Sequence, residues 1–209
     1  DGWTPLGLVK AVPSVAGWQA RSLPRWVAPE DVRLLLGSCD RRSERGRRDY
    51  ALLLMLVRLG LRAGEVASMR LDDIDWRAGE VVVHGKDRRE EPMPLPNDIG
   101  EALADYLREG RPITESRSVF LRLLAPRQGM TPSGVTSVVY GACDRAGLGR
   151  IGAHRLRHTA GTDMLRAGAS LAEVGQALRQ RVPATTAIYA KVDHARLRSL
   201  ARAWPGGVS

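Results

Sequence analysis

The stretch from Tyr50 to Val57 is the longest uninterrupted run of apolar side chains in the chain. With its flanks, Asp49 to Leu59, it is apolar nearly all the way round a helix, and such a helix is stable only when it is buried on every side. The run is far shorter than the roughly 20 apolar residues that a transmembrane helix needs. We therefore expect a helix at the centre of a hydrophobic core, and no membrane span.

The charge balance of the chain indicates an acidic partner. Its 209 residues include 32 Lys and Arg against 23 Asp and Glu, a formal net charge of +9. Most of the cations are Arg, whose planar guanidinium binds two phosphate oxygens at once. We expect nucleic acid as the partner, with a membrane surface a distant second. Cys39 and Cys143 cannot build a disulfide framework and have no metal-type spacing, so we expect reduced thiols in a cytoplasmic protein without a zinc site.

The remaining patterns predict a mainly α fold with a small antiparallel β-hairpin, an α+β class. Residues 1–25 are rich in Gly and Pro and show no period, so we expect a linker or arm from a missing N-terminal domain, and one domain over 26–209. Two β-type runs, 79–84 and 91–95, predict the hairpin, and the prolines of the second run confine it to a sheet edge. The basic stretch 41–48 is expected to be a charged loop, either solvated or on the DNA backbone. Further helices are expected from Pro29, after Gly64 and after Gly152, and behind the caps Asn97, Thr131 and Ser170. A short helical turn is expected over 184–189, and a last helix over 193–203.

One helix start carries a pattern that suits an anion. His154 and Arg157 follow Gly152 and are three residues apart, so they project from one face of the first turn. The unpaired backbone N–H groups and the positive end of the helix dipole gather at the same place. An imidazole and a guanidinium there predict a phosphate cradle, although the same pair is often only a cap or a solvated helix start.

Other residues complete a chemically coherent set for cutting a phosphodiester without metal. Arg62 and Arg157 could hold the oxygens of the transition state bidentately, and His154 could take a proton from a tyrosine whose reference pKa is about 10. Lys86, at the hairpin tip, could protonate the leaving oxygen. Core packing explains the other three tyrosines, since Tyr50 lies in the expected buried helix and Tyr106 and Tyr140 follow apolar helical periods. Tyr189 follows a Thr-Thr turn outside any long apolar stripe, so it is the candidate nucleophile, with an interface aromatic as the alternative.

The ordered set of motifs resembles the catalytic domain of the tyrosine recombinases, the family of phage integrases and bacterial Xer-type recombinases. The resemblance covers roughly Trp26 to Arg202. It is carried by Gly60-Leu61-Arg62-Ala63-Gly64-Glu65, Leu71-Asp72-Asp73-Ile74-Asp75-Trp76, Gly85-Lys86, Pro94-Leu95-Pro96, His154-Arg155-Leu156-Arg157-His158-Thr159 and Thr185-Thr186-Ala187-Ile188-Tyr189.

The resemblance implies a role for each matching residue. Arg62 and Arg157 would clamp the scissile phosphate of double-stranded DNA, with Glu65 bracing Arg62. Lys86 would protonate the leaving 5′-oxygen, and Tyr189 would form a 3′-phosphotyrosyl link. His154 would handle the tyrosine proton, and His158 is a second-tier candidate that either contacts phosphate or braces the helix. Neither ATP nor a metal is implied, and the helix over 193–203 would dock on a neighbouring subunit.

One position departs from the family pattern. Family members carry His, or sometimes Trp, nine residues before the tyrosine in a Leu-Gly-His type motif, whereas this chain has Gln180 there. An amide can donate a hydrogen bond but carries neither charge nor a transferable proton. The alternative function is therefore a catalytically weakened or inactive DNA-binding relative. An Arg-rich helical protein that binds RNA or acidic proteins is a third reading, which rests on charge alone.

Overall fold

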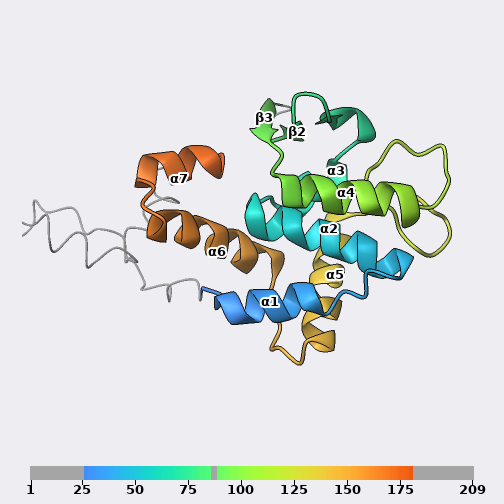
Figure 1. Cartoon of the computed structure of the whole chain (residues 1–209), viewed down its shortest axis with the longest axis horizontal. Coiled ribbons are helices and arrows are strands. Elements are labelled where there is room, and N and C mark those ends of the chain that lie inside the picture. Colours follow the sequence, from blue (N-terminus) through green and yellow to red (C-terminus); the bar gives the residue numbers. More distant parts are fainter. Residues whose placement is uncertain (1–25, 86–88, 181–209) are drawn as a thin grey trace, which may run out of the picture.

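The computed structural model describes residues 26–85 and 89–180. These residues form a mainly helical domain with one small antiparallel sheet, which confirms the predicted fold class (Figure 1). Among the described helices, none is long and apolar enough to cross a bilayer. The helices are α1 Pro29–Gly37, α2 Glu44–Arg58, α3 Ala63–Ser68, α4 Asn97–Glu109, α5 Pro132–Arg145, α6 Ala153–Arg166 and α7 Leu171–Ala177.

Helix α2 is the centre of the domain, as the apolar run predicted. It packs against α1, α3, α4, α5 and α6, and its residues from Ala51 to Leu56 are all buried. In Figure 1 it lies between α4 on one side and α1 with α5 on the other. Burying six consecutive residues stabilises the fold by roughly 1.5–3 kcal/mol for each large apolar side chain. The remaining elements are placed by their packing on this helix.

The prediction of a loop over 41–48 was wrong for most of that stretch. Helix α2 begins at Glu44, because the Ser43 side chain caps it by accepting the Gly46 N–H at 3.0 Å. Gly46 is needed there for space rather than as a helix breaker, since a Cβ would lie 1.9 Å from the carbonyl oxygen of Asp40. The first turn of α2 is thus built from residues whose composition alone suggests a loop.

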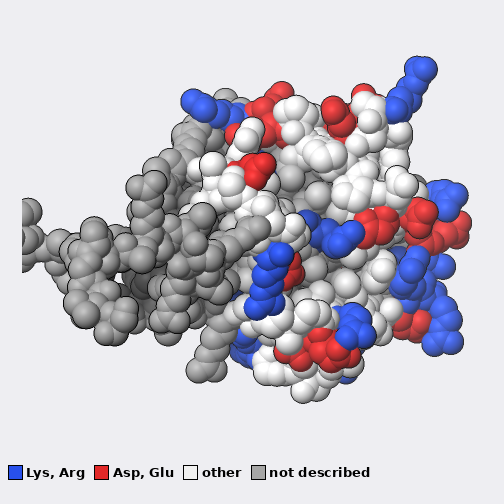
Figure 2. Space-filling model, turned by 60° about the vertical axis from the view of Figure 1, so that its left-hand side comes forward, with Lys and Arg blue, Asp and Glu red and all other residues white. Residues whose placement is uncertain are grey.

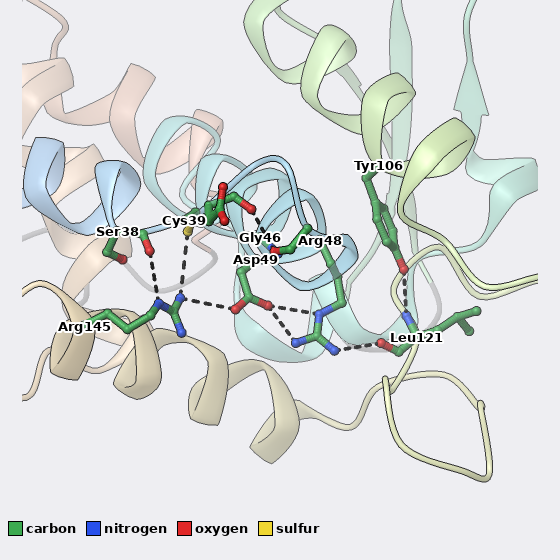
Figure 3. Close-up of polar contacts among 10 residues, drawn as sticks. Ser38, Cys39, Gly46, Arg48, Asp49, Tyr106, Leu121 and Arg145 are labelled. Carbon is green, nitrogen blue, oxygen red and sulfur yellow. Dashed lines mark hydrogen bonds and ion pairs between the residues drawn. The ribbon is translucent and has the colours of Figure 1, made fainter.

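A buried polar network joins α2 to α5. The Asp49 carboxylate accepts hydrogen bonds from Arg48 at 2.7 Å and from Arg145 at 3.3 Å, and it lies between the two guanidiniums (Figure 3). Arg48 also donates to the carbonyl of Leu121 at 3.1 Å. Cys39 lies beside Arg145, and burial, then the charge of Asp49, raises the pKa of its thiol. Both cysteines are free and buried, as expected.

The sheet has the order β1-β2-β3, with β1 Ile74–Asp75, β2 Glu80–His84 and β3 Glu90–Pro94. Strands β2 and β3 form the predicted hairpin, and Val82 pairs with Pro92 in its antiparallel register. The second run lies at the sheet edge, as its prolines predicted. Strand β1 was not predicted, because two residues are too few to show an alternating pattern. The hairpin tip, 86–88, lies outside the described residues.

The last described elements turn back onto the core. Helix α5 is capped by the Thr131 hydroxyl, which accepts the Gly134 N–H at 3.1 Å, and the Ser170 hydroxyl caps α7 in the same way. Asn97 does not cap α4 as predicted, since it is the first residue of that helix and Pro96 precedes it. Leu165 of α6 packs with Val174 and Leu178 in a small second cluster. This cluster holds α7 against the end of α6.

The net positive charge is concentrated outside the described part of the chain. Residues 1–25, 86–88 and 181–209 hold 10 of the 32 Lys and Arg but only 3 of the 23 Asp and Glu. Figure 2 shows acidic side chains beside basic ones on the face that it presents. The stretch 41–48 fits this picture, because Arg41 and Arg47 both pair with Asp105 and Arg42 pairs with Asp40.

Candidate nucleic-acid cleavage site

The start of α6 forms one wall of the candidate site. Gly152 precedes the helix with an extended backbone and provides no side chain, so the first N–H groups of α6 are not capped by it. His154 is exposed on this first turn, whereas Arg157 is only 2% exposed. The two residues that the sequence placed on one helical face therefore differ in depth, with the imidazole at the surface and the guanidinium inside.

The start of α3 forms a second wall. Arg62 precedes α3, and the Glu65 carboxylate accepts both its backbone N–H at 2.8 Å and its Nη1 at 2.6 Å. Glu65 has a side chain only 5% exposed, whereas that of Arg62 is 46% exposed. Burial raises the pKa of Glu65, but the Arg62 N–H bond and the charges of Arg179 and Arg62 outweigh it and hold that pKa below its usual value. Glu65 is thus an ionised brace, and Arg62 remains open to solvent.

A pocket of about 350 Å³ brings these two helix starts together. Arg62, His154 and Arg157 all line it, although 92 residues or more separate Arg62 from the other two along the chain. Tyr140 of α5 lines it as well, so the expectation of core packing was wrong for that tyrosine. The remaining lining residues are Ala63, Thr136, Gly152 and Ala153. Two guanidiniums and a helix start around one cavity are suited to a phosphate.

Arg157 is held in place by backbone carbonyls. Its Nη1 donates to the carbonyl of Gly60 at 2.7 Å, and its Nη2 donates to the carbonyl of Leu178. The Glu65 carboxylate is 3.9 Å from the same Nη1. The guanidinium therefore links α6 to the turn before α3 and to the end of α7, and carbonyls from these two places fix its orientation.

His154 and His158 form a pair on successive turns of α6. Their Nε2 atoms are 2.8 Å apart, and the rings meet edge to face. Burial, followed by the charges of His154 and Arg157, lowers the pKa of His158 to about 4. Partial burial and the charges of Arg157 and Arg62 likewise lower the pKa of His154. A neutral imidazole can accept a proton from a hydroxyl group at neutral pH.

The structure places Gln180 in another pocket from Arg62 and Arg157. Gln180 lies just after α7, and its N–H donates to the carbonyl of Gly175 at 2.8 Å. It lines a pocket of about 810 Å³ between β3 and α7, together with Arg179 and Met93. Lys86 and Tyr189 lie outside the described residues, as do the predicted turn 184–189 and helix 193–203. The structure therefore brings together Arg62, Glu65, His154, Arg157 and His158.

Sequence reasoning missed Arg179. Its guanidinium reaches Glu65, with Nη2 2.8 Å from Oε2, so Glu65 is shared between Arg179 and Arg62. The one signal that could have pointed to it is the family motif itself, because Arg179 stands where the Leu-Gly-His pattern has Gly. That departure lies directly before the one noted at Gln180.

The described helices and small sheet have the architecture of a tyrosine recombinase catalytic domain. A sequence model described as the phage integrase family matches residues 25–196. The putative integrase/recombinase y4rA of Sinorhizobium fredii is 52% identical over 202 residues, 95% of this chain and 49% of that protein. The chain belongs to the phage integrase family.

Two further comparisons extend this result. The tyrosine recombinase XerD of Listeria innocua is 34% identical over 186 residues, which cover 87% of this chain and 63% of that protein. A crystal structure of the XerH site-specific recombinase bound to palindromic difH substrate, a post-cleavage complex, matches with a TM-score of 0.71 and 25% identity. That match covers 88% of this chain and 54% of the XerH chain. The chain spans about half the length of y4rA, so it corresponds to only part of such a protein.

Proposed function

We propose that this chain is the catalytic part of a site-specific DNA recombinase or integrase. The observation that carries the proposal is the convergence of Arg62, His154 and Arg157 on one pocket, in a chain of the phage integrase family. The pocket presents two guanidiniums and a helix start to an anion, and a DNA phosphate matches that chemistry. Residues 26–209 form the catalytic domain in this proposal, and residues 1–25 form a linker.

In the proposed reaction, the hydroxyl oxygen of Tyr189 forms a bond to the scissile phosphorus as the bond to the 5′-oxygen breaks. The tyrosine proton passes to His154, and Lys86 gives a proton to the departing oxygen. Arg62 and Arg157 neutralise the charge that builds on the other phosphate oxygens. The 3′-phosphotyrosyl link keeps the energy of the broken bond, so that a second DNA strand can attack it without ATP or a metal ion.

The burial of the two arginines supports different tasks within that step. Arg62 is half exposed and braced from behind by Glu65, so it is placed to meet the phosphate as DNA arrives. Arg157 is held by the carbonyls of Gly60 and Leu178, so its guanidinium is oriented before any substrate binds. Preorganised donors of this kind lower the barrier because they need no rearrangement as charge develops.

A nicked suicide substrate tests the proposal. In such a duplex, the short fragment released by cleavage diffuses away and cannot be rejoined. Incubation with it should therefore trap a covalent protein–DNA adduct. The adduct should be absent in Tyr189→Phe and strongly reduced in Arg62→Ala, whereas Tyr50→Phe, a matched change at another tyrosine, should leave it unchanged. An adduct that persists in Tyr189→Phe would refute the nucleophile assignment.

Gln180 favours one alternative function, that of a DNA-binding relative that is catalytically weakened or inactive. If Gln180 replaces a phosphate donor, we expect cleavage slower by about 10- to 1000-fold rather than abolished. The variant Gln180→His separates the two proposals. A large gain in adduct formation identifies a weakened enzyme, and DNA binding without cleavage in either form identifies a binding protein.

The proposed partner is a double-stranded DNA recombination site, in the bacterial cytoplasm. The XerH comparison supports this partner, since that recombinase was solved on its DNA site. We further propose that several copies assemble on the site through residues 193–203. Sedimentation with and without target DNA measures this assembly, and a protein that remains monomeric on its cleavable site contradicts it.

A further inference from the structure

Arg179 adopts a backbone conformation that arginine rarely takes. It follows α7 with φ of 53°, and it is the only non-glycine residue with positive φ in the part of the chain that the structure describes. Side chains with a Cβ are disfavoured in this left-handed region, where glycine is the usual residue. A residue held there against its preference indicates that contacts of its side chain compensate for the strain.

Those contacts are internal and centre on Glu65. The Arg179 side chain is only 6% exposed, and its Nη2 donates to Glu65 Oε2 at 2.8 Å. Its Nη1 donates to the carbonyl of Ala177 at 3.3 Å and contacts Met93 of β3, while its buried Nε has no hydrogen-bond partner among the described residues. Burying a guanidinium this deeply is unfavourable unless a carboxylate compensates for it. Glu65 is that carboxylate.

The two oxygens of Glu65 bind different guanidiniums. Oε1 accepts from the Arg62 side chain at 2.6 Å, whereas Oε2 accepts from the Arg179 side chain and from the Arg62 backbone N–H, both at 2.8 Å. Arg157 is 3.9 Å from Oε2, beyond hydrogen-bond distance, and donates instead to backbone carbonyls. While Arg179 binds Oε2, the Glu65 carboxylate keeps its hydrogen bond to the Arg62 side chain. It also does not compete with the Gly60 and Leu178 carbonyls for the Arg157 guanidinium.

We propose that Arg179 is a positioning residue for the phosphate-binding arginines, acting through Glu65. It binds Oε2 beside the Arg62 backbone N–H and so helps to hold Oε1 against the Arg62 guanidinium. It also ties the end of α7, which contributes the Leu178 carbonyl to Arg157, to the start of α3. The proposal rests on the proposed function in one respect: the benefit of this alignment is faster DNA cleavage.

The test compares Arg179→Gly with Arg179→Lys in the full chain. Glycine removes the guanidinium and suits the left-handed backbone, so this variant is expected to fold. We expect adduct formation at saturating DNA to slow by about tenfold or more in Arg179→Gly, with DNA affinity changed by less than about threefold. Arg179→Lys should recover part of the rate. The exposed Arg127→Gly, a loop change with the same loss of charge, should cleave at the normal rate.

Two NMR readouts decide the proposal even if the protein cleaves no DNA. Among the residues that the structure describes, the charged groups that face Glu65 are Arg62, Arg157 and Arg179. Losing Arg179 should therefore raise the pKa of Glu65 in a carboxyl-carbon titration, and should speed hydrogen exchange at the Arg62 side chain. If both are unchanged in Arg179→Gly, or if that variant cleaves at the normal rate, the proposal is overturned. Absent cleavage in the unaltered protein, with both shifts present, counts against the proposed function alone.

Discussion

The guanidinium of Arg157 donates from Nη1 to the backbone carbonyl of Gly60, 2.7 Å away and 97 positions earlier in the chain. Gly60 has φ of +60°, and a Cβ built on it would lie 2.6 Å from Leu178 Cδ2 and 3.3 Å from Ala160 Cβ. The turn between α2 and α3 can therefore come close enough to accept this hydrogen bond only because Gly60 has no side chain. The position of Arg157 therefore depends on Gly60, which acts only through its backbone.

Gly60→Ala should destabilise the domain by about 2–4 kcal/mol, because a left-handed backbone and a steric clash with Leu178 both add to the cost. Urea unfolding measures this loss. Gly147→Ala is the matched control, since Gly147 has φ of +67° but nothing within 4 Å of its Cβ position. The control should lose only about 1–2 kcal/mol. Equal losses in the two variants contradict the steric part of the argument.

Arg157→Lys should loosen the attachment of α7. A lysine carries one ammonium group and cannot reproduce the fork that reaches both Gly60 and Leu178, so a buried carbonyl loses its donor. We expect a loss of about 1–3 kcal/mol for that carbonyl. Amide hydrogen exchange over α7 should become faster, while exchange in α4, which packs mainly against α2, should stay the same. Unchanged exchange in α7 is the adverse result.

The free energy of unfolding should fall as the pH decreases through the range between the folded and unfolded pKa values of His158. Its pKa is about 4 in the folded protein and about 6.5 when unfolded. Between these values the unfolded chain binds more protons than the folded one, so stability is fully present above about pH 6.5 and is lost as the pH falls toward 4. The expected loss is on the order of 3 kcal/mol.

Urea unfolding at several pH values measures the loss due to His158. His158→Asn, which has no titrating group, should show a shallower fall over the same window. Other groups also titrate there, so the difference between the two slopes is the quantity that tests the assignment. Identical slopes contradict a buried neutral His158.

Asp49→Ala should cost about 3–5 kcal/mol, because it leaves the buried Arg48 guanidinium without its carboxylate. The double change Arg48→Met with Asp49→Leu should recover much of that loss, since it removes both buried charges together. Asp105→Ala, which breaks only partly exposed pairs with Arg41 and Arg47, should cost less than about 1 kcal/mol. Thermal or urea unfolding distinguishes these outcomes, and a similar cost for Asp49→Ala and Asp105→Ala contradicts the account.

Features with a local physical cause could be predicted from the sequence. The central helix followed from its apolar run, the edge position of β3 from its prolines, and the start of α5 from the Thr131 cap. The loop prediction over 41–48 failed because Gly46 and a cluster of charges argue against a helix by composition. What decides the outcome is a cap at Ser43 and a close contact with Asp40.

The residues of the candidate site were likewise predicted only in part. The motifs predicted that Arg62, His154 and Arg157 act together, and the structure places them around one pocket. The bond between Glu65 and Arg179 joins positions 114 apart, and no local pattern reveals that this guanidinium turns inward. Tyr140 was misassigned because a helical period tells which face is covered, but not whether the covering is core or cavity wall.

The prolines of β3 disfavour strand pairing between neighbouring copies of the protein. Proline has no amide hydrogen, so a strand that approached the free side of β3 from another copy would find no donor at positions 92 and 94. Strand addition from another copy is therefore disfavoured at the β3 edge of the sheet. If several copies assemble on one DNA site, as proposed, the β3 edges of neighbouring copies would not seed strand-to-strand aggregation.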